Sequence, residues 1–244
     1  FTYWVDQDKK NSEEYILYFH QSGLGLPDRD YYFTEGEKFE DIRTKYVEYM
    51  TKILELAKDK NAVEIANTVM EMEKALADNH WTRVENRDSE KTYNKFEVSK
   101  LSGLSPKFNW LLFLDKAGIA KAENVIVRQP SYLAAFSNVL SKYSIDDWKN
   151  YSKAKLISSN ATELSQDFVE ANFDFYGKTL RGTEVNRPRW KRAVSAVDGS
   201  LDEILGKVYV EKYFKPEAKD RMVKLVDNLI ISMEDRINKV DWMS

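Results

Sequence analysis

Hydrophobic residues recur at spacings of three and four along most of this chain, which is typical of helices with one buried face. The first such run covers residues 39–57, and a second covers residues 62–76. Asn61 comes directly before the second run, where it suits the N-cap of a helix. Because few residues separate the two runs, the pattern predicts an antiparallel helix pair.

The same spacing predicts helices in the second half of the chain. Ser144 and Asp147 resemble a capping box, with Asp in place of the usual Glu, and the helix that they begin is predicted to continue to about residue 177. Further helices are predicted over residues 98–104, 109–117, 130–140, 188–208 and 216–240. A proline opens each of the last three, which suits a first helical turn.

The start of the chain has a different pattern. Residues 1–5 and 14–19 are rich in aromatic and β-branched residues, a composition typical of strands. The polar residues 6–12 lie between them, so the pattern predicts a short β-hairpin with a loop of medium length. An isolated hairpin is marginally stable in water, so we expect it to pack on the helices or to pair with chain outside this sequence. Residues 124–130 form another extended run, which Pro130 ends.

A corner is predicted at residues 23–32, where the sequence reads Gly23-Leu24-Gly25-Leu26-Pro27-Asp28-Arg29-Asp30-Tyr31-Tyr32. The glycines and the proline interrupt both helical and strand patterns. No internal repeat and no Ser/Gly/Pro-rich linker divides the sequence. We therefore expect a mainly α fold, in which residues 1–244 form one multi-helix domain with a small N-terminal β-hairpin.

Composition narrows the class of protein. Apolar residues make up 43% of the 244 residues, enough for a real hydrophobic core, and the net charge of −3 argues against a nucleic-acid partner. No apolar run approaches the roughly 20 residues of a membrane span. Cysteine is absent, which excludes disulfides and leaves the compartment undecided. Both ends look cut, because the chain starts at Phe1 and ends after an amphipathic helix, so we expect a piece of a longer protein.

Catalytic chemistry has few candidates in this sequence. His20 and His80 are the only histidines, and neither has a metal-ligand partner at helical spacing, so packing or capping roles are favoured for both. No nucleophile elbow or phosphate loop occurs. The 40 acidic residues contain no distinctive pair, which leaves catalysis by two carboxylates open without assigned residues. We therefore assign no catalytic and no metal-binding residue.

Three polar clusters each allow two interpretations. Asp28, Arg29 and Asp30 suit a substrate contact or, as we favour, a buried ion pair that acts as a structural lock on the corner. Residues 85–88 suit a pocket lining or, as we favour, an ionic link between two helix ends. Residues 187–192 surround Trp190 with basic side chains, which suits a peptide carboxylate or a solvated helix start whose tryptophan enters the core. We favour the second.

Four ordered blocks of this sequence resemble the neprilysin and endothelin-converting-enzyme family of zinc metallopeptidases. They cover essentially the whole chain: Gly23 to Tyr32; Glu85-Asn86-Arg87-Asp88 with Tyr93-Asn94-Lys95; Arg189-Trp190-Lys191-Arg192 with Gly206-Lys207-Val208-Tyr209-Val210-Glu211; and Asp241-Trp242-Met243. The Asn-Arg-Asp motif and the lack of cysteine resemble bacterial oligopeptidase members more than disulfide-bonded animal ectodomains.

This resemblance implies which part of such an enzyme the chain is. The family's catalytic lobe carries a His-Glu-x-x-His helix, and that motif does not occur here, so no catalytic residue can be transferred. The chain looks like most of the helical, non-catalytic lobe, which encloses the peptide-binding cavity and restricts substrate size. We expect no cofactor in this piece and zinc in the parent, with the catalytic lobe of the same chain and peptide substrates as partners. The family also implies an exported parent, at the cell surface, in the periplasm or secreted.

Substrate-cavity candidates follow from the same resemblance: Arg87, Arg189 and Trp190. Two rival interpretations remain. One is a stand-alone helical module for protein interaction, and the other is a small independent enzyme that uses carboxylates. The chain ends that look cut favour the enzyme lobe over both.

Overall fold

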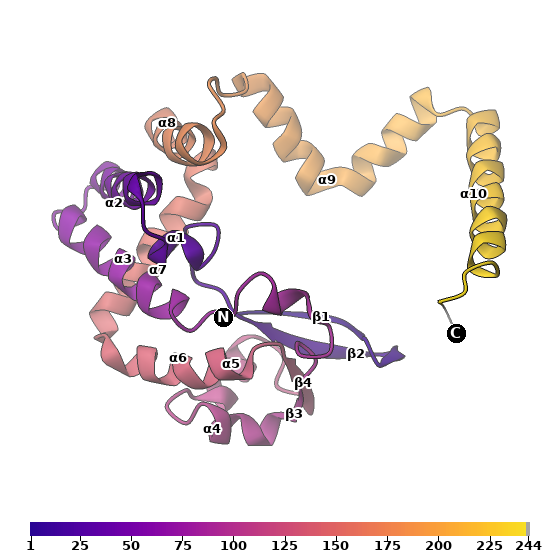
Figure 1. The fold of residues 1–244 in the computed structure, drawn as a ribbon. Helices are drawn as coiled ribbons and strands as arrows, with labels where there is room; N and C mark the ends of the chain where they lie inside the picture. Colours follow the sequence, from indigo (N-terminus) through magenta and orange to yellow (C-terminus); the bar gives the residue numbers. More distant parts are fainter. Residues whose placement is uncertain (243–244) are drawn as a thin grey trace. The chain divides into compact units, whose positions relative to one another are not determined.

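A computed structural model describes residues 1–242 of this chain (Figure 1). This part of the chain holds ten α-helices and four β-strands. Contacts divide the chain into two units, Phe1–Val185 and Asn186–Ser244. The predicted mainly α fold with a small N-terminal hairpin is confirmed, and one domain over residues 1–244 stays a prediction. Of the four sequence blocks, only the last extends beyond the described residues, at Met243.

The hairpin that opens the first unit is longer than the sequence predicted. β1 (Thr2–Asp8) pairs antiparallel with β2 (Asn11–His20), and two residues between them form the turn. The prediction of a medium loop at residues 6–12 is therefore wrong. Polar residues can pair in a strand when their side chains stay in water, and most of β1 is exposed. The hydrophobic pattern alone missed these pairs.

The end of β1 is tied to a strand that the sequence did not reveal. Asp8 is buried, and its carboxylate accepts hydrogen bonds from the Tyr93 hydroxyl at 2.7 Å and the Lys95 ammonium at 3.0 Å. Lys95 begins β3 (Lys95–Glu97). The buried carboxylate is thus compensated by a cation and a hydroxyl from one later segment, as a buried charge requires.

The strands form one mixed sheet in the order β1-β2-β4-β3. β4 (Asn124–Val127), the predicted extended run, lies parallel to β2 and antiparallel to β3. The hairpin therefore pairs within this chain. Alternation along β2 buries Leu17 and Phe19 on one face and Ile16 and Tyr18 on the other. The first face packs on a core with Trp110, Leu114 and Leu133.

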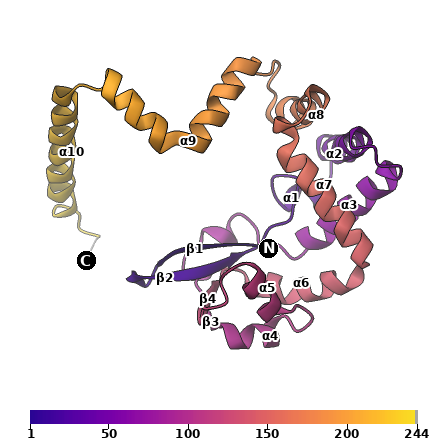
Figure 2. The same ribbon diagram turned by 180° about the vertical axis from the view of Figure 1, so that it is seen from behind.

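A second core lies among the long helices of the same unit. α2 (Glu37–Leu56), α3 (Ala62–Ala77) and α7 (Ile145–Asn160) pack against one another, and the two views of the ribbon show them side by side (Figures 1 and 2). The predicted pair of helices after the corner is thus confirmed. The other helices of this unit are α1 (Asp30–Phe33), α4 (Leu101–Leu104), α5 (Trp110–Lys116), α6 (Pro130–Lys142) and α8 (Gln166–Asn172).

The predicted helix over residues 144–177 begins as expected and then breaks. Ser144 Oγ accepts from the Asp147 backbone N–H at 3.1 Å, and the Asp147 carboxylate accepts from the Ser144 N–H at 2.9 Å, which completes the capping box. Beyond α7 the backbone becomes extended at Leu164 and Ser165, and α8 starts afresh. A π-helix, Phe173–Thr179, follows. The apolar period continued through this break, so the sequence pattern concealed it.

The second unit consists of two helices that the sequence predicted. α9 (Arg189–Tyr213) has a kink at Leu201, and α10 (Pro216–Ile237) starts at its proline. No side chain of α9 or α10 is buried among the described residues, although both helices carry apolar stripes. The apolar stripes predicted from the sequence are present on both helices. The spacing of apolar residues does not indicate which residues pack against them. Among residues 1–242, none of the helices is both long and apolar enough to cross a membrane.

We expect Ser144→Ala to lower the free energy of unfolding by about 1 kcal/mol, because it removes the cap of α7. Ser165→Ala is the matched control. Ser165 also stands at the N-cap of a helix, but its side chain makes no capping hydrogen bond. Urea unfolding followed by circular dichroism measures both variants, and equal losses would contradict the assigned role of the capping box.

Candidate functional site

The corner at residues 23–32 is held by tyrosine hydroxyls that come from distant helices. Three of them donate to backbone carbonyls of the corner and of Ser22 just before it. The donors and acceptors are Tyr132 of α6 to Ser22 at 2.9 Å, Tyr151 of α7 to Gly23 at 2.5 Å, and Tyr176 of the π-helix to Gly25 at 3.1 Å. Burial is the main cause that raises the pKa of all three, so they stay protonated donors. Three carbonyls of this irregular backbone therefore have hydrogen-bond donors without a strand or helix.

Tyr32 joins the corner to the core. Its hydroxyl accepts from the backbone N–H groups of Gly25 and Leu26, both at 3.1 Å, and donates to the Glu73 carboxylate at 2.7 Å. Burial, then the negative charge of Glu73, raises the pKa of Tyr32 well above its usual range. A single phenol thus closes the corner onto α3.

Glu73 is the buried charge at the centre of this arrangement. It is fully buried, and its carboxylate also accepts from the Tyr46 hydroxyl at 3.0 Å and the Lys155 ammonium at 2.9 Å. Three donors, one of them cationic, compensate for its loss of water. The sequence carried a signal that we did not use. Glu73 lies four residues after Val69 and three before Leu76, on the buried stripe of α3.

Gly25 is required by this packing. A Cβ atom at position 25 would overlap the hydroxyl of Tyr46, one of the Glu73 donors. Tyr46 is fully buried and held by Glu73, so it has little room to move. The glycine therefore permits close approach of backbone and side chain rather than an unusual backbone angle.

The predicted structural lock, Asp28-Arg29-Asp30, is arranged differently from the favoured ion pair. Asp28 pairs with Arg83, from the loop after α3, at 2.7 Å, and also accepts from the Asp30 backbone N–H at 2.8 Å. Asp30 is exposed, and Arg29 forms no ion pair among the described residues. Asp28 thus has a cationic partner that the sequence did not indicate. The role of these three residues as a structural lock stays a prediction. Of the three, only Asp28 forms an ion pair among the described residues.

Amide side chains join the first part of the loop at residues 81–91 to the sheet, and Glu90 of the same loop pairs with Lys10 of the hairpin turn at 3.2 Å. Gln129 accepts from the Gln21 backbone N–H at 2.9 Å, and its amide donates to Asn86 at 2.5 Å. Gln21 in turn binds the backbone of Trp81 through both of its amide atoms. Glu85 binds only Thr82 among the described residues. Asp88 pairs with Lys91 of the same loop at 3.6 Å, and no described ion pair joins residues 85–88 to a second helix end. The favoured ionic link between helix ends is therefore wrong.

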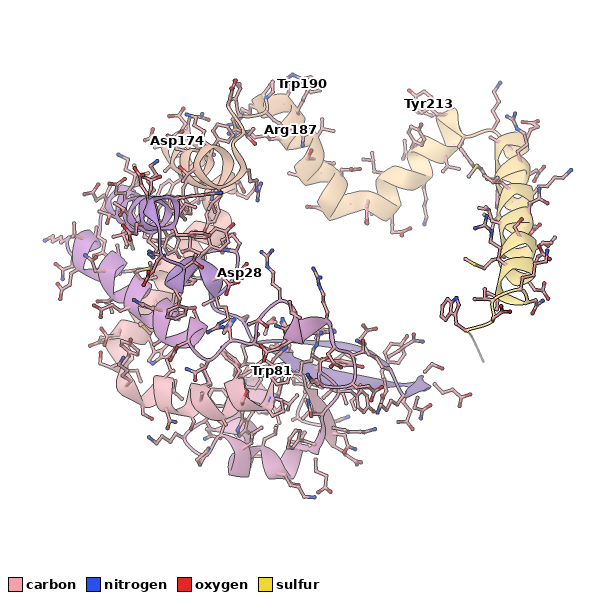
Figure 3. The ribbon with its side chains drawn as sticks, viewed as in Figure 1. Asp28, Trp81, Asp174, Arg187, Trp190 and Tyr213 are labelled. Carbon is pink, nitrogen blue, oxygen red and sulfur yellow. The ribbon has the colours of Figure 1, made fainter. Side chains whose placement is uncertain are left out.

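The cavity candidates lie in different units. Arg87 is exposed in a 3₁₀ turn, Glu85–Arg87, of the first unit. Arg189 and Trp190 stand at the start of α9 in the second unit, where Figure 3 marks Trp190. Trp190 is 64% exposed, with the Lys191 ammonium 5.4 Å from its ring centre, so it does not enter a core as we favoured. That Arg87, Arg189 and Trp190 face a substrate cavity stays a prediction.

A cavity of about 310 Å³ lies between the corner and the loop after α3. Figure 3 shows Asp28 and Trp81, one from each of these segments. Most of its wall is polar, and both histidines contribute to it. The lining comprises residues 20–24 and 26–29 together with His80, Trp81, Arg83 and Asn86. This is the place where the described residues of the first unit gather the most varied chemistry.

Both histidines are neutral at pH 7. Burial lowers the pKa of His20 and of His80 to about 4, and nearby Arg128 adds to the effect at His20. His20 Nδ1 shares a hydrogen bond with the Gln129 amide at 3.0 Å, and the His80 ring stands edge-on to Tyr132. These contacts fit the packing roles that the sequence favoured.

A metal site does not fit the residues present. Among residues 1–242, no three His, Asp or Glu side chains come together as a group that could hold a metal ion. The buried Glu73 and Asp8 each have a lysine as partner instead. Taken together, the fold and the site define a helical scaffold with buried polar joints.

Comparison with known proteins gives the family. The sequence model of Peptidase family M13 matches residues 1–244. Mouse neprilysin is 30% identical over 99% of this chain, and mouse endothelin-converting enzyme 1 is 30% identical over 100% of it. The chain spans about a third of these relatives, 34% and 32% of their lengths. This chain belongs to peptidase family M13, and the resemblance stated from the four sequence blocks is confirmed.

Solved bacterial structures share the fold. The zinc metalloprotease Zmp1 of Mycobacterium tuberculosis, in complex with an inhibitor, has a TM-score of 0.88 and 33% identity and is matched over 100% of this chain and 37% of its own. PepO from Lactobacillus rhamnosis HN001 has a TM-score of 0.83 at 18% identity, over 100% of this chain and 39% of its own, which shows the fold alone.

We expect Tyr32→Phe to lower the free energy of unfolding by about 1–3 kcal/mol, because it leaves buried N–H groups and a carboxylate oxygen without a partner. Tyr31→Phe is the matched control, since the neighbouring Tyr31 hydroxyl makes no hydrogen bond among the described residues. Urea unfolding monitored by fluorescence measures both. A loss no larger in Tyr32→Phe than in Tyr31→Phe would refute the central place of this hydroxyl.

Acid should destabilise the fold through its two histidines. Their pKa values are about 4 in the folded protein and about 6.5 when unfolded, so the unfolded state binds more protons between these values. Stability present above pH 6.5 is therefore lost as pH falls toward 4. The double variant His20→Gln/His80→Gln should lose less stability than the natural sequence between pH 7 and pH 4.5, by roughly 2 kcal/mol for each histidine. Identical losses in urea unfolding would show that carboxylates alone cause the acid effect.

Proposed function

We propose that this chain is most of the helical, non-catalytic lobe of a zinc metalloendopeptidase whose parent hydrolyses peptide bonds of oligopeptides. The observation that carries this proposal is the match of Peptidase family M13 over the whole chain, which nevertheless spans only about a third of its relatives. The zinc is assigned to the parent, because no described group of residues fits a metal here. The chain by itself is proposed to be inactive.

The proposed role of this lobe is to enclose the peptide-binding cavity and to exclude large substrates. A wall of rigid helices suits that role, since the first unit has two packed cores and satisfied polar joints. Domain opening and closing admits substrate in many enzymes with enclosed sites. Zmp1, which is similar to this chain, has been solved in an open state and in a partial open state. These structures support a lobe that moves against its partner.

The proposed partner within the parent is the catalytic lobe of the same chain. Support comes from the second unit, whose helices expose large apolar side chains. On α10 these include Met222, Leu225, Leu229, Ile230, Met233 and Ile237. Exposed apolar surface of this extent marks an interaction site. The stripe repeats at helical spacing, so a packed protein surface suits it better than a small ligand.

The main rival is a stand-alone helical module for protein interaction, which the exposed faces of α9 and α10 would also suit. The two hypotheses differ in what the longer protein contains. A parent with a His-Glu-x-x-His helix after residue 244 favours the peptidase lobe, and a stop codon without it favours the module. Stoichiometric zinc bound to residues 1–244 alone, or peptide hydrolysis by them, would contradict our proposal.

In the intact protein, we expect Arg87→Ala, Arg189→Ala and Trp190→Ala to lower kcat/KM for peptide cleavage. A lost contact worth about 1 kcal/mol corresponds to about fivefold. Arg181→Ala is the control, because Arg181 is an exposed arginine outside the three sequence blocks that lie within residues 1–242. Assays should use a short peptide and a long one, since a size-restricting wall affects the long peptide more. Unchanged kinetics in all three variants would remove the proposed cavity contacts.

A further inference from the structure

Arg29 is a half-buried cation without a counter-ion. Its Nε is buried and has no hydrogen-bond partner, and no carboxylate among the described residues pairs with its guanidinium. The nearest aromatic contact is the Phe33 ring, 5.8 Å from Cζ. Removing a charge from water is costly unless an opposite charge or hydrogen bonds replace the water. An anion beside the Arg29 guanidinium would therefore offset this cost.

Neither Asp28 nor Glu85, the two acidic side chains beside this cavity, forms an ion pair with Arg29. The Asp28 carboxylate holds Arg83 at 2.7 Å and the Asp30 N–H at 2.8 Å. Glu85 is near enough for Arg29 to help lower the pKa of its carboxyl, after the larger effect of hydrogen bonds from Thr82. That carboxylate is held by Thr82 at 2.7 Å and forms no ion pair with Arg29. Arg29 therefore has a longer-range electrostatic interaction with Glu85 but no direct ion pair with either carboxylate.

Arg29 lines the cavity of about 310 Å³ beside the corner. Among the described residues that line it, Arg29 and Arg83 are cationic and Asp28 is the one acidic side chain, which leaves an excess of positive charge. His80 also lines the cavity, and its ring is neutral at pH 7, so it leaves this charge balance unchanged. A water molecule occupies about 30 Å³ in the liquid, so the cavity has room for an ion of several heavy atoms.

We propose that this cavity binds a small oxyanion, a carboxylate or a phosphate, with the Arg29 guanidinium as its main partner. Arginine offers parallel N–H donors that match the two oxygens of such groups. The positive excess disfavours a metal cation, and the polar wall disfavours an apolar ligand. This inference concerns the first unit alone and does not depend on the proposed peptidase function.

The oxyanion has two possible sources with the same chemistry. It is either a free anion from solution or a carboxylate side chain from a part of the intact protein outside residues 1–244. The second source is available because the relatives of this chain are about three times as long. A crystal structure of the intact protein, soaked in sodium selenate, distinguishes the two.

Anomalous selenium density within hydrogen-bond distance of Arg29 is the result expected for a free anion. A protein carboxylate at the same place would establish the internal source. A cavity that contains only water, or selenate bound only elsewhere, would overturn the proposal. This experiment uses the natural sequence, so it does not require a substituted protein to fold.

Calorimetric titration of the intact protein with inorganic phosphate at pH 7 tests the free-anion source in solution. We expect saturable binding that weakens at least tenfold in Arg29→Gln and is unchanged in Arg181→Gln, which removes the same charge from an exposed position. Arg29→Lys should retain part of the affinity, because it keeps the charge without the paired donors. Saturable binding that is equal in the natural protein and in folded Arg29→Gln would refute a site centred on Arg29.

Discussion

The buried carboxylate of Glu73 is the constraint on which the corner of this fold depends. It lies on the inner face of α3 and accepts hydrogen bonds from a lysine of α7 and from one tyrosine each of α1 and α2. One of them, Tyr32, binds the corner backbone at the same time. An unpaired charge in this core would cost several kcal/mol, so these four side chains must be placed together. The polar hub therefore couples the irregular segment to three helices.

Other backbone groups of the corner and of the loop after α3 are hydrogen-bonded by neutral side chains. Tyrosine hydroxyls take the carbonyls of the corner, and paired amides of Gln21, Gln129 and Asn86 join the loop after α3 to the sheet. Neutral amides and phenols suit these positions, because they form hydrogen bonds with backbone groups and no charge has to be removed from water. Arg29 differs from these groups, because its buried Nε has no hydrogen-bond partner and no described carboxylate pairs with its guanidinium.

The role that we propose for this member of peptidase family M13 makes a demand on these joints. A wall that shapes an enclosed cavity must keep its form while a partner lobe opens and closes. The first unit has two packed cores and the polar hub, which are features that the proposed wall would require. The second unit has the opposite character, with apolar stripes on α9 and α10 that no described side chain covers.

The sequence by itself determined the class of fold, the long helices and the family, because the apolar period and the four motif blocks are local. It also determined the capping box at Ser144, whose partners are three residues apart. Tertiary structure decided the mixed sheet, the break after α7 and the partner of Asp28, because each depends on contacts between segments distant in the chain. Glu73 shows the difference most clearly. Its position on the apolar stripe was visible, but its three donors come from 27 to 82 residues away, and only packing could bring them together.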